Sequence, residues 1–301
     1  MDYPAKILLF GEYGIILKSM ALAIPYFRFS GQFTFADAKG ESLSEEESES
    51  NKELSRVLTY FQNDIEKFGY LDFKHFKDDV NRGIYFGSTI PHGYGLGSSG
   101  ALTAAIYERY SCDLHHNDYQ KIKTELAAIE NCFHGSSSGI DPLTSLLKQP
   151  VLLENETSAV STTDLSPFFN TYTMFLINTN SRGNTGELVT RFLKRYRDAE
   201  YRERIDNEYI PLINQTIDAA ISSNLRNFGT LITRYSEFQL SHFGEMIPAT
   251  FKKYFEYGSA TGEFHLKLCG SGGGGYLLAF SADRLKAEAY FNLNHLDYSI
   301  V

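Results

Sequence analysis

The sequence is poor in residues that several common protein classes need. It has three cysteines among 301 residues, Cys112, Cys132 and Cys269, and no Cys-x-x-Cys pair. An odd number of widely spaced cysteines argues against a disulfide framework or a zinc site and is typical of a reduced, cytoplasmic protein. No Gly-Lys-Ser or Gly-Lys-Thr tripeptide occurs, which excludes a Walker A nucleotide-binding loop.

Basic residues are also scarce. Lysine and arginine total 28 against 37 aspartates and glutamates, so the formal net charge is −9. Sequence-independent binding to nucleic acid or to an anionic membrane needs a positive surface, so we expect neither partner. The apolar run near the N-terminus follows no basic segment and is too short for a signal peptide or a membrane span. An anionic ligand must therefore be held by a metal ion, by backbone N–H groups or by a few placed cations.

The composition is that of an ordinary soluble globular protein, with 43% hydrophobic and 22% charged residues. A chain of this length buries a sizeable core in one large domain or two smaller ones. Strand and helix patterns are mixed without strict alternation, which favours an α+β fold over a doubly wound sheet. In the N-terminal part, the local patterns predict two short strands within 6–17, a strand over 26–36 and a solvated acidic loop over 39–53. In the C-terminal part, they predict helices over 187–257 with breaks at Pro211 and Gly229, and a strand–glycine turn–strand over 264–280.

Two glycine-rich segments formally match Gly-x-Gly-x-x-Gly: PHGYGLGSSGAL, residues 91–102, and Gly270–Gly275. A dinucleotide-binding fingerprint must directly follow a strand and open a helix, with an acidic strand-end residue about 20 positions on. Neither segment meets these conditions. Two interpretations of the first segment stay open: an anion-binding loop at a helix N-terminus, or a strand-to-helix turn capped by Ser98.

Three segments together resemble the GHMP kinases, a family named for galactokinase, homoserine kinase, mevalonate kinase and phosphomevalonate kinase. They are PAKILLFGEYG at 4–14, PHGYGLGSSGAL at 91–102 and KLCGSGGGGYLLAF at 267–280. The resemblance implies a two-domain fold, with an N-terminal domain like ribosomal protein S5 domain 2 over 1–170 and a ferredoxin-like domain over 171–301. It also implies that ATP is the phosphoryl donor and Mg²⁺ the metal.

The resemblance assigns the glycine loop to the phosphates of ATP. The implied nucleotide-binding residues are Gly93, Gly95, Leu96, Gly97, Ser98, Ser99, Thr185 and the supporting Gly272. Thr185 also follows Asn184, which with Glu187 forms a plausible helix-capping pair, so a purely structural role for this position stays open.

Residues 129–145, IENCFHGSSSGIDPLTS, resemble the mevalonate kinase branch of the family. The resemblance implies that Glu130 and Ser99 ligate Mg²⁺, that Asp141 takes the proton of the acceptor hydroxyl, and that Lys6 is the cation beside it. Each has a structural alternative: Glu130 as an exposed helix residue, Asp141 as the N-cap before Pro142, and Lys6 as a solvated strand-end lysine.

The first motif leaves the acceptor open. Ala5 replaces the family's glycine and Tyr13 its histidine, and Gly-Glu-Tyr is more usual in phosphomevalonate kinases. Glu12 and Tyr13 are expected to face the substrate. The favoured acceptor is mevalonate, giving 5-phosphomevalonate. Phosphomevalonate kinase is the alternative, ahead of a sugar or homoserine kinase and of a non-catalytic ligand sensor. We expect a cytoplasmic protein that acts on a small molecule, and a homodimer is compatible with the sequence.

Overall fold

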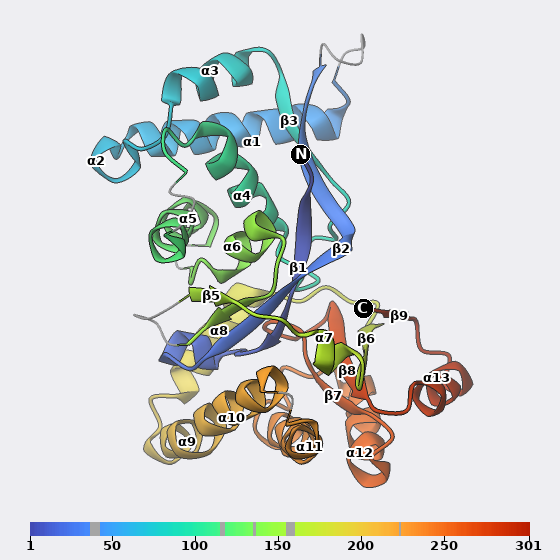
Figure 1. The fold of residues 1–301 in the computed structure, drawn as a ribbon. Helices are drawn as coiled ribbons and strands as arrows, with labels where there is room; N and C mark the ends of the chain where they lie inside the picture. Colours follow the sequence, from blue (N-terminus) through green and yellow to red (C-terminus); the bar gives the residue numbers. More distant parts are fainter. Residues whose placement is uncertain (37–42, 115–117, 135–136, 155–159, 223) are drawn as a thin grey trace. The chain divides into compact units, whose positions relative to one another are not determined.

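The computed structural model describes residues 1–36, 43–114, 118–134, 137–154, 160–222 and 224–301. Two compact units make up the chain, and Figure 1 shows their elements in chain order. Unit 1 comprises residues 1–6, 25–90 and 97–149, and unit 2 comprises residues 7–24, 91–96 and 150–301. Strands β1 (Tyr3–Phe10) and β2 (Ala21–Phe35) contribute residues to both units. The predicted domain boundary at residue 170 stays a prediction.

Unit 1 is mainly helical. Its remaining elements are α1 (Glu45–Gln62), α2 (Ile65–Phe68), α3 (Phe73–Asn81), β3 (Ile84–Ser88), α4 (Ser98–Tyr110), α5 (Tyr119–His134) and α6 (Ile140–Leu147). Strand β3 pairs antiparallel with the second half of β2, from Gly31 to Phe35. Helices α4 and α6 lie side by side (Figure 1). Small buried residues of α4, among them Gly100, Ala101 and Ala104, allow this close approach.

The acidic segment 39–53 is not simply a solvated loop, so that prediction is wrong for its second part. Helix α1 begins at Glu45, and Ser44 and Glu47 form a reciprocal capping box. Three glutamates in the first turn complement the positive end of the helix dipole. Residues 37–42 lie outside the described part of the chain.

Unit 2 contains a four-stranded antiparallel sheet of order β7-β8-β6-β9. Its elements are β4 (Val151–Leu153), β5 (Val160–Thr162), α7 (Ser166–Phe169), β6 (Thr173–Asn178), α8 (Thr185–Arg195), α9 (Ala199–Arg204), α10 (Ile210–Ile221), α11 (Leu225–His242), α12 (Lys252–Thr261), β7 (His265–Leu268), β8 (Tyr276–Ser281), α13 (Arg284–Leu293) and β9 (Tyr298–Ile300), with short turns η1 (Gly14–Leu17), η3 (Ile205–Tyr209) and η4 (Ala249–Phe251). Helices intervene between β6 and β7 and between β8 and β9, which is the ferredoxin-like β-α-β-β-α-β order. The predicted ferredoxin-like C-terminal fold is confirmed.

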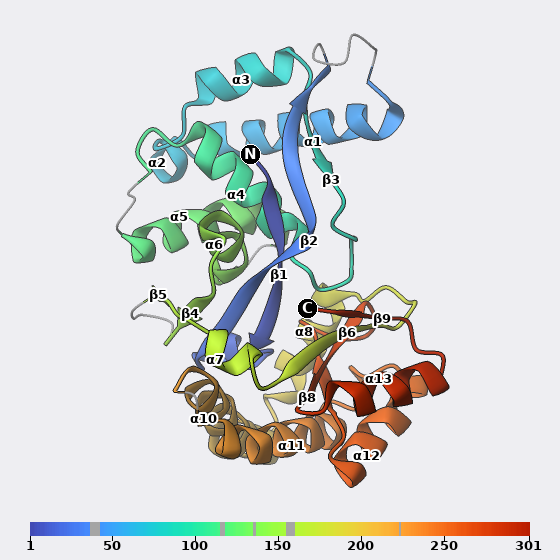
Figure 2. The same ribbon diagram turned by 45° about the vertical axis from the view of Figure 1, so that its right-hand side comes forward.

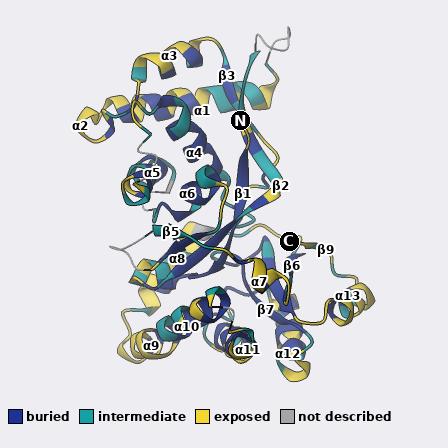
Figure 3. Ribbon diagram, viewed as in Figure 1, coloured by how far each residue is buried: buried dark blue, intermediate teal, exposed yellow. Residues whose placement is uncertain are grey.

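The core of unit 2 is rich in aromatic rings. Phe10 stacks on Phe280 at a centroid distance of 5.6 Å and meets Phe228 and Tyr235 edge-on. Helices α10 and α11 are neighbours, as Figure 2 also shows. Figure 3 shows that the strands are largely buried, whereas α9, α12 and α13 have exposed faces.

Three local predictions in unit 2 are wrong. The second predicted strand within 6–17 is the short 3₁₀ turn η1. Gly229 lies inside α11, where the space of its missing side chain is taken by the Tyr172 hydroxyl, 3.0 Å from an ideal Cβ position. Pro211 does not end a helix: it stands in the first turn of α10, directly after the π-helical turn η3, where its missing N–H is tolerated.

Candidate active site

Helix α4 starts at Ser98, directly after the first glycines of the glycine loop. Gly97 is the N-cap residue, in a left-handed conformation with φ 71°, and no side chain caps the helix. The alternative with Ser98 as N-cap is therefore wrong. An ideal Cβ on Gly97 would lie 2.8 Å from Cγ of Lys6, so only glycine lets the loop approach the lysine. A helix start of this kind favours an anion.

Lys6 and Asp141 form an ion pair beside this helix start. The Lys6 Nζ to Asp141 Oδ2 distance is 2.9 Å, and the two side chains are 5% and 29% exposed. The alternative of a solvated lysine is therefore wrong. The N-cap of α6 is Gly139, and Asp141 stands within the first turn, so the N-cap alternative for Asp141 is also wrong. An ideal Cβ on Gly100 would lie only 3.0 Å from Cβ of Asp141, so α4 packs directly against the start of α6.

Glu130 is buried on α5, with 4% of its surface exposed, so the alternative of an ordinary exposed glutamate is wrong. Its carboxylate accepts hydrogen bonds from the Ser99 hydroxyl, at 3.1 Å, and from the Ser137 hydroxyl. Burial, followed by the nearby Asp141 charge, raises the pKa of Glu130 to about 7. The structure thus brings together four of the predicted residues, Lys6, Ser99, Glu130 and Asp141, in unit 1.

The donor set around Glu130 suits a hard cation. One carboxylate and a neighbouring hydroxyl offer the oxygen ligands that Mg²⁺ prefers, and Mg²⁺ commonly takes its remaining ligands from substrate phosphates and water. Among the described residues, no group of three or more His, Cys, Asp or Glu side chains is arranged to hold a metal by itself. The residues therefore fit an ion that arrives with a nucleotide better than one held in an all-protein cage.

The first half of the glycine loop packs against the second glycine segment within unit 2. An ideal Cβ on Gly95 would lie 2.4 Å from the carbonyl oxygen of Cys269, and one on Gly275 would lie 2.6 Å from Cα of Tyr94. Gly93 accepts a 3.1 Å hydrogen bond from the backbone N–H of Gly183. The loop is thus held by backbone contacts that leave no room for a side chain.

Three other predicted nucleotide-binding residues lie in unit 2: Leu96, Gly272 and Thr185. Leu96 is buried, with 1% of its surface exposed. Gly272 has φ 74°, and an ideal Cβ there would lie 2.5 Å from the carbonyl oxygen of Met246. Thr185 is the first residue of α8, and its side chain lies outside the described part of the chain. The predicted capping pair is present, because Asn184 accepts from the Glu187 N–H at 3.4 Å.

Residues 54–149 match the family model described as the GHMP kinases N terminal domain. The chain is 27% identical over 316 residues to a mevalonate kinase of Pyrococcus horikoshii, an alignment that covers 95% of this chain and 89% of the relative. Its structure is similar to the mevalonate kinase of Methanococcus jannaschii, with a TM-score of 0.64, 19% identity and coverage of 100% and 96%. It is also similar to a Streptococcus pneumoniae phosphomevalonate kinase in complex with phosphomevalonate and AMPPNP, with a TM-score of 0.67, 13% identity and coverage of 100% and 99%.

The chain has the fold of the GHMP kinases. The findings support kinase activity and leave the acceptor open, because solved kinases with different acceptors match this fold with TM-scores of 0.64 and 0.67. The helices of the described residues include none that is both long and apolar enough to cross a bilayer.

Glu12 and Tyr13 of the first GHMP motif are engaged inside unit 2. The Glu12 carboxylate is fully buried, pairs with Lys267 and accepts a 2.8 Å hydrogen bond from the Tyr235 hydroxyl. The Tyr13 hydroxyl donates to the carbonyl oxygen of Ser271 at 2.6 Å. Their predicted contact with substrate stays a prediction.

The sequence analysis did not predict two residues that contact Glu130 and Glu12, namely Ser137 and Lys267. Ser137 lies in a run of three serines with no feature that distinguishes it as a partner of Glu130. Lys267 is a lysine inside the apolar strand β7, and its side chain is completely buried. A charged residue within an apolar strand is a signal that it has a buried partner.

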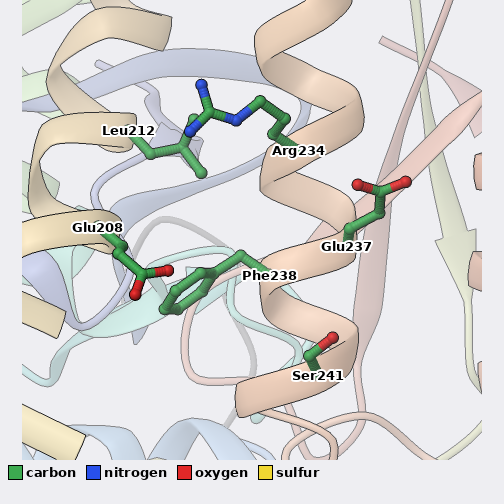
Figure 4. A pocket seen from close by; sticks show the side chains of 6 residues that line it. All are labelled: Glu208, Leu212, Arg234, Glu237, Phe238 and Ser241. Carbon is green, nitrogen blue, oxygen red and sulfur yellow. The ribbon is translucent and has the colours of Figure 1, made fainter. Parts of the chain in front are cut away.

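A surface pocket of unit 2 lies apart from these assignments (Figure 4). It is lined by Glu208, Leu212, Arg234, Glu237, Phe238 and Ser241, from η3, α10 and α11. None of the predicted site residues lines it. Its mixture of two carboxylates, one guanidinium and apolar side chains favours no particular ligand chemistry.

Proposed function

We propose that this protein is an ATP- and Mg²⁺-dependent kinase that transfers the terminal phosphoryl group of ATP to the hydroxyl of mevalonate, giving 5-phosphomevalonate. The single observation that supports catalysis best is the Lys6–Asp141 ion pair at 2.9 Å, next to the uncapped start of α4. The 27% identity to a mevalonate kinase over 95% of the chain supports the choice of acceptor.

Asp141 is the proposed proton acceptor. Its carboxylate is 29% exposed, so a substrate hydroxyl can reach it, while its ion pair with Lys6 fixes its orientation. The Lys6 ammonium also offers positive charge to the transferring group.

The start of α4 and Glu130 would hold the ATP phosphates and the metal ion. Backbone N–H groups at Ser98 and Ser99 suit the phosphates, and Glu130 with the Ser99 hydroxyl suits the metal. When bound, Mg²⁺ neutralises negative charge on the phosphates during transfer.

A test compares ADP release with mevalonate, phosphomevalonate, homoserine and galactose at equal concentration. Mevalonate is expected to be preferred by about tenfold or more, a difference of about 1.4 kcal/mol in transition-state binding. Faster turnover of phosphomevalonate would overturn the proposed acceptor and favour the second candidate, to which the Gly11-Glu12-Tyr13 motif points. No turnover of any of the four, with ATP bound, would favour a ligand sensor.

A companion test uses Asp141→Asn. The variant should lose kcat by a factor on the order of 100 or more while its affinity for ATP stays near that of the parent protein, because the lost interaction forms mainly in the transition state. Unchanged kcat would restrict Asp141 to a structural role in α6.

A further inference from the structure

The glycine loop has no cationic side chain of the kind that usually binds a polyphosphate. Residues 91–100 read PHGYGLGSSG, without lysine or arginine. Backbone N–H groups contribute partial charges only. In a protein of net charge −9, a placed side-chain cation would add to the attraction of a metal ion and of backbone N–H groups for an anionic ligand.

Arg182 lies directly against this loop within unit 2. An ideal Cβ on Gly93 would lie 3.6 Å from Cβ of Arg182 and 3.9 Å from its Cγ. The stem of the arginine therefore runs next to the first glycine of the loop. Its side chain is exposed, and its guanidinium forms no ion pair with any residue that the structure describes.

The backbone that bears Arg182 is fixed on both sides. Gly183 donates to the carbonyl of Gly93 at 3.1 Å, and Gly275 donates to the carbonyl of Ser181 at 2.6 Å. An ideal Cβ on Gly274 would lie 2.6 Å from the carbonyl carbon of Arg182. The arginine thus projects from a segment locked between the two glycine segments, while its own side chain has no competing partner among the described residues.

We infer that Arg182 binds phosphate oxygens of the nucleotide at residues 91–96, the part of the glycine loop that belongs to unit 2, and supplies a guanidinium cation to this part of the loop. The inference rests on the proposed function, because it names the group that holds the phosphoryl donor. A guanidinium is suited to this task because its planar fork donates two parallel hydrogen bonds to phosphate oxygens. Arg182 is a binding residue in this scheme and takes no proton.

The test measures calorimetric dissociation constants of ATP, ADP and adenosine for the full chain in Mg²⁺ buffer, with Arg182→Ala and Arg182→Lys. Arg182→Ala should weaken ATP and ADP binding by about tenfold or more and leave adenosine binding unchanged, because adenosine has no phosphate. Arg182→Lys should recover part of the loss, since it keeps the charge but not the fork. The deficit of Arg182→Ala should shrink at high salt.

Arg226→Ala is the matched control. Arg226 is an exposed arginine on α11 in the same unit, so its removal changes net charge equally without touching the loop. It should bind all three ligands like the parent protein. Equal loss of ATP affinity in both alanine variants would overturn the inference in favour of a general charge effect.

Other outcomes separate this inference from the proposed function. Unchanged ATP and ADP affinity in Arg182→Ala would overturn the inference alone, as would a rise confined to the KM of the acceptor. A parent protein that binds neither ATP nor ADP would overturn both, with the proposed function failing first. Unfolding curves of Arg182→Ala should match those of the parent, because the side chain is exposed.

Discussion

Replacing Glu130 with glutamine should stabilise the ligand-free protein at alkaline pH while it removes Mg²⁺-dependent activity. Burial raises the pKa of this carboxyl from 4.5 to about 7. Each pKa unit corresponds to about 1.36 kcal/mol, so a rise of about 2.5 units costs roughly 3.4 kcal/mol of folding stability when the group is fully ionised. Glutamine keeps the shape of the protonated acid and can still hydrogen-bond to Ser99 and Ser137.

The direction of the pH effect follows from where each state binds the proton. Below pH 4.5 the Glu130 carboxyl is protonated in both the folded and unfolded states. Between pH 4.5 and about 7 the unfolded state releases the proton first, so the free energy of unfolding of the parent protein falls as pH rises. Above about pH 7 the loss is complete. The glutamine variant has no such titration at this position.

The assay is urea unfolding in the presence of a chelator. Between about pH 5.5 and about pH 8.5, the free energy of unfolding of Glu130→Gln minus that of the parent should rise by about 2 kcal/mol. Glu66→Gln, an exposed change on α2, is the control and should show no such trend. A difference that stays constant with pH, or that falls as pH rises, would refute the reasoning from burial.

Two further predictions concern unit 2. Gly95→Ala should destabilise the fold by about 1–3 kcal/mol and weaken ATP binding, because φ is +78° and the new Cβ would lie 2.4 Å from the Cys269 carbonyl oxygen. Urea unfolding curves measure the first effect and ATP titration the second. Values equal to those of the parent protein would contradict the prediction. Lys267→Met should cost about 3–5 kcal/mol in the free energy of unfolding, because it leaves the buried Glu12 carboxylate unpaired. Adding Glu12→Gln to it should restore part of that loss in urea melts, and additive losses would argue against the ion pair.

Part of the local structure was predictable from the sequence because it depends on residue types at short spacings. The strand before the glycine loop and the helix after it follow from local patterns, but the N-cap is Gly97 and not Ser98. The ferredoxin-like fold of the C-terminal half was implied by the resemblance of three segments to the GHMP kinases, whereas local patterns predicted only its strand–glycine turn–strand. The capping box at Ser44 and Glu47 was also present in the sequence, and the acidic composition of the surrounding segment concealed it.

Other features depend on contacts between residues far apart in the chain. Whether Asp141 caps its helix or pairs with Lys6 cannot be decided locally, since the partners are separated by more than a hundred residues. Gly229 appears as a helix breaker until Tyr172 is seen to occupy its side-chain space. The apolar residues 15–17 favour a strand locally, but the positive φ values at Gly11 and Tyr13 turn the chain before a strand can form.

The sequence by itself determined the fold class, the glycine segments and the identity of the charged residues, because periodicity, turn residues and helix-start signals are properties of neighbouring positions. Only the tertiary structure decided the states of those residues: which carboxylate is buried with a raised pKa, which lysine is paired and which arginine is left exposed beside the glycine loop. Desolvation and ion pairing act over a few ångströms of space, and only folding brings such distant positions that close.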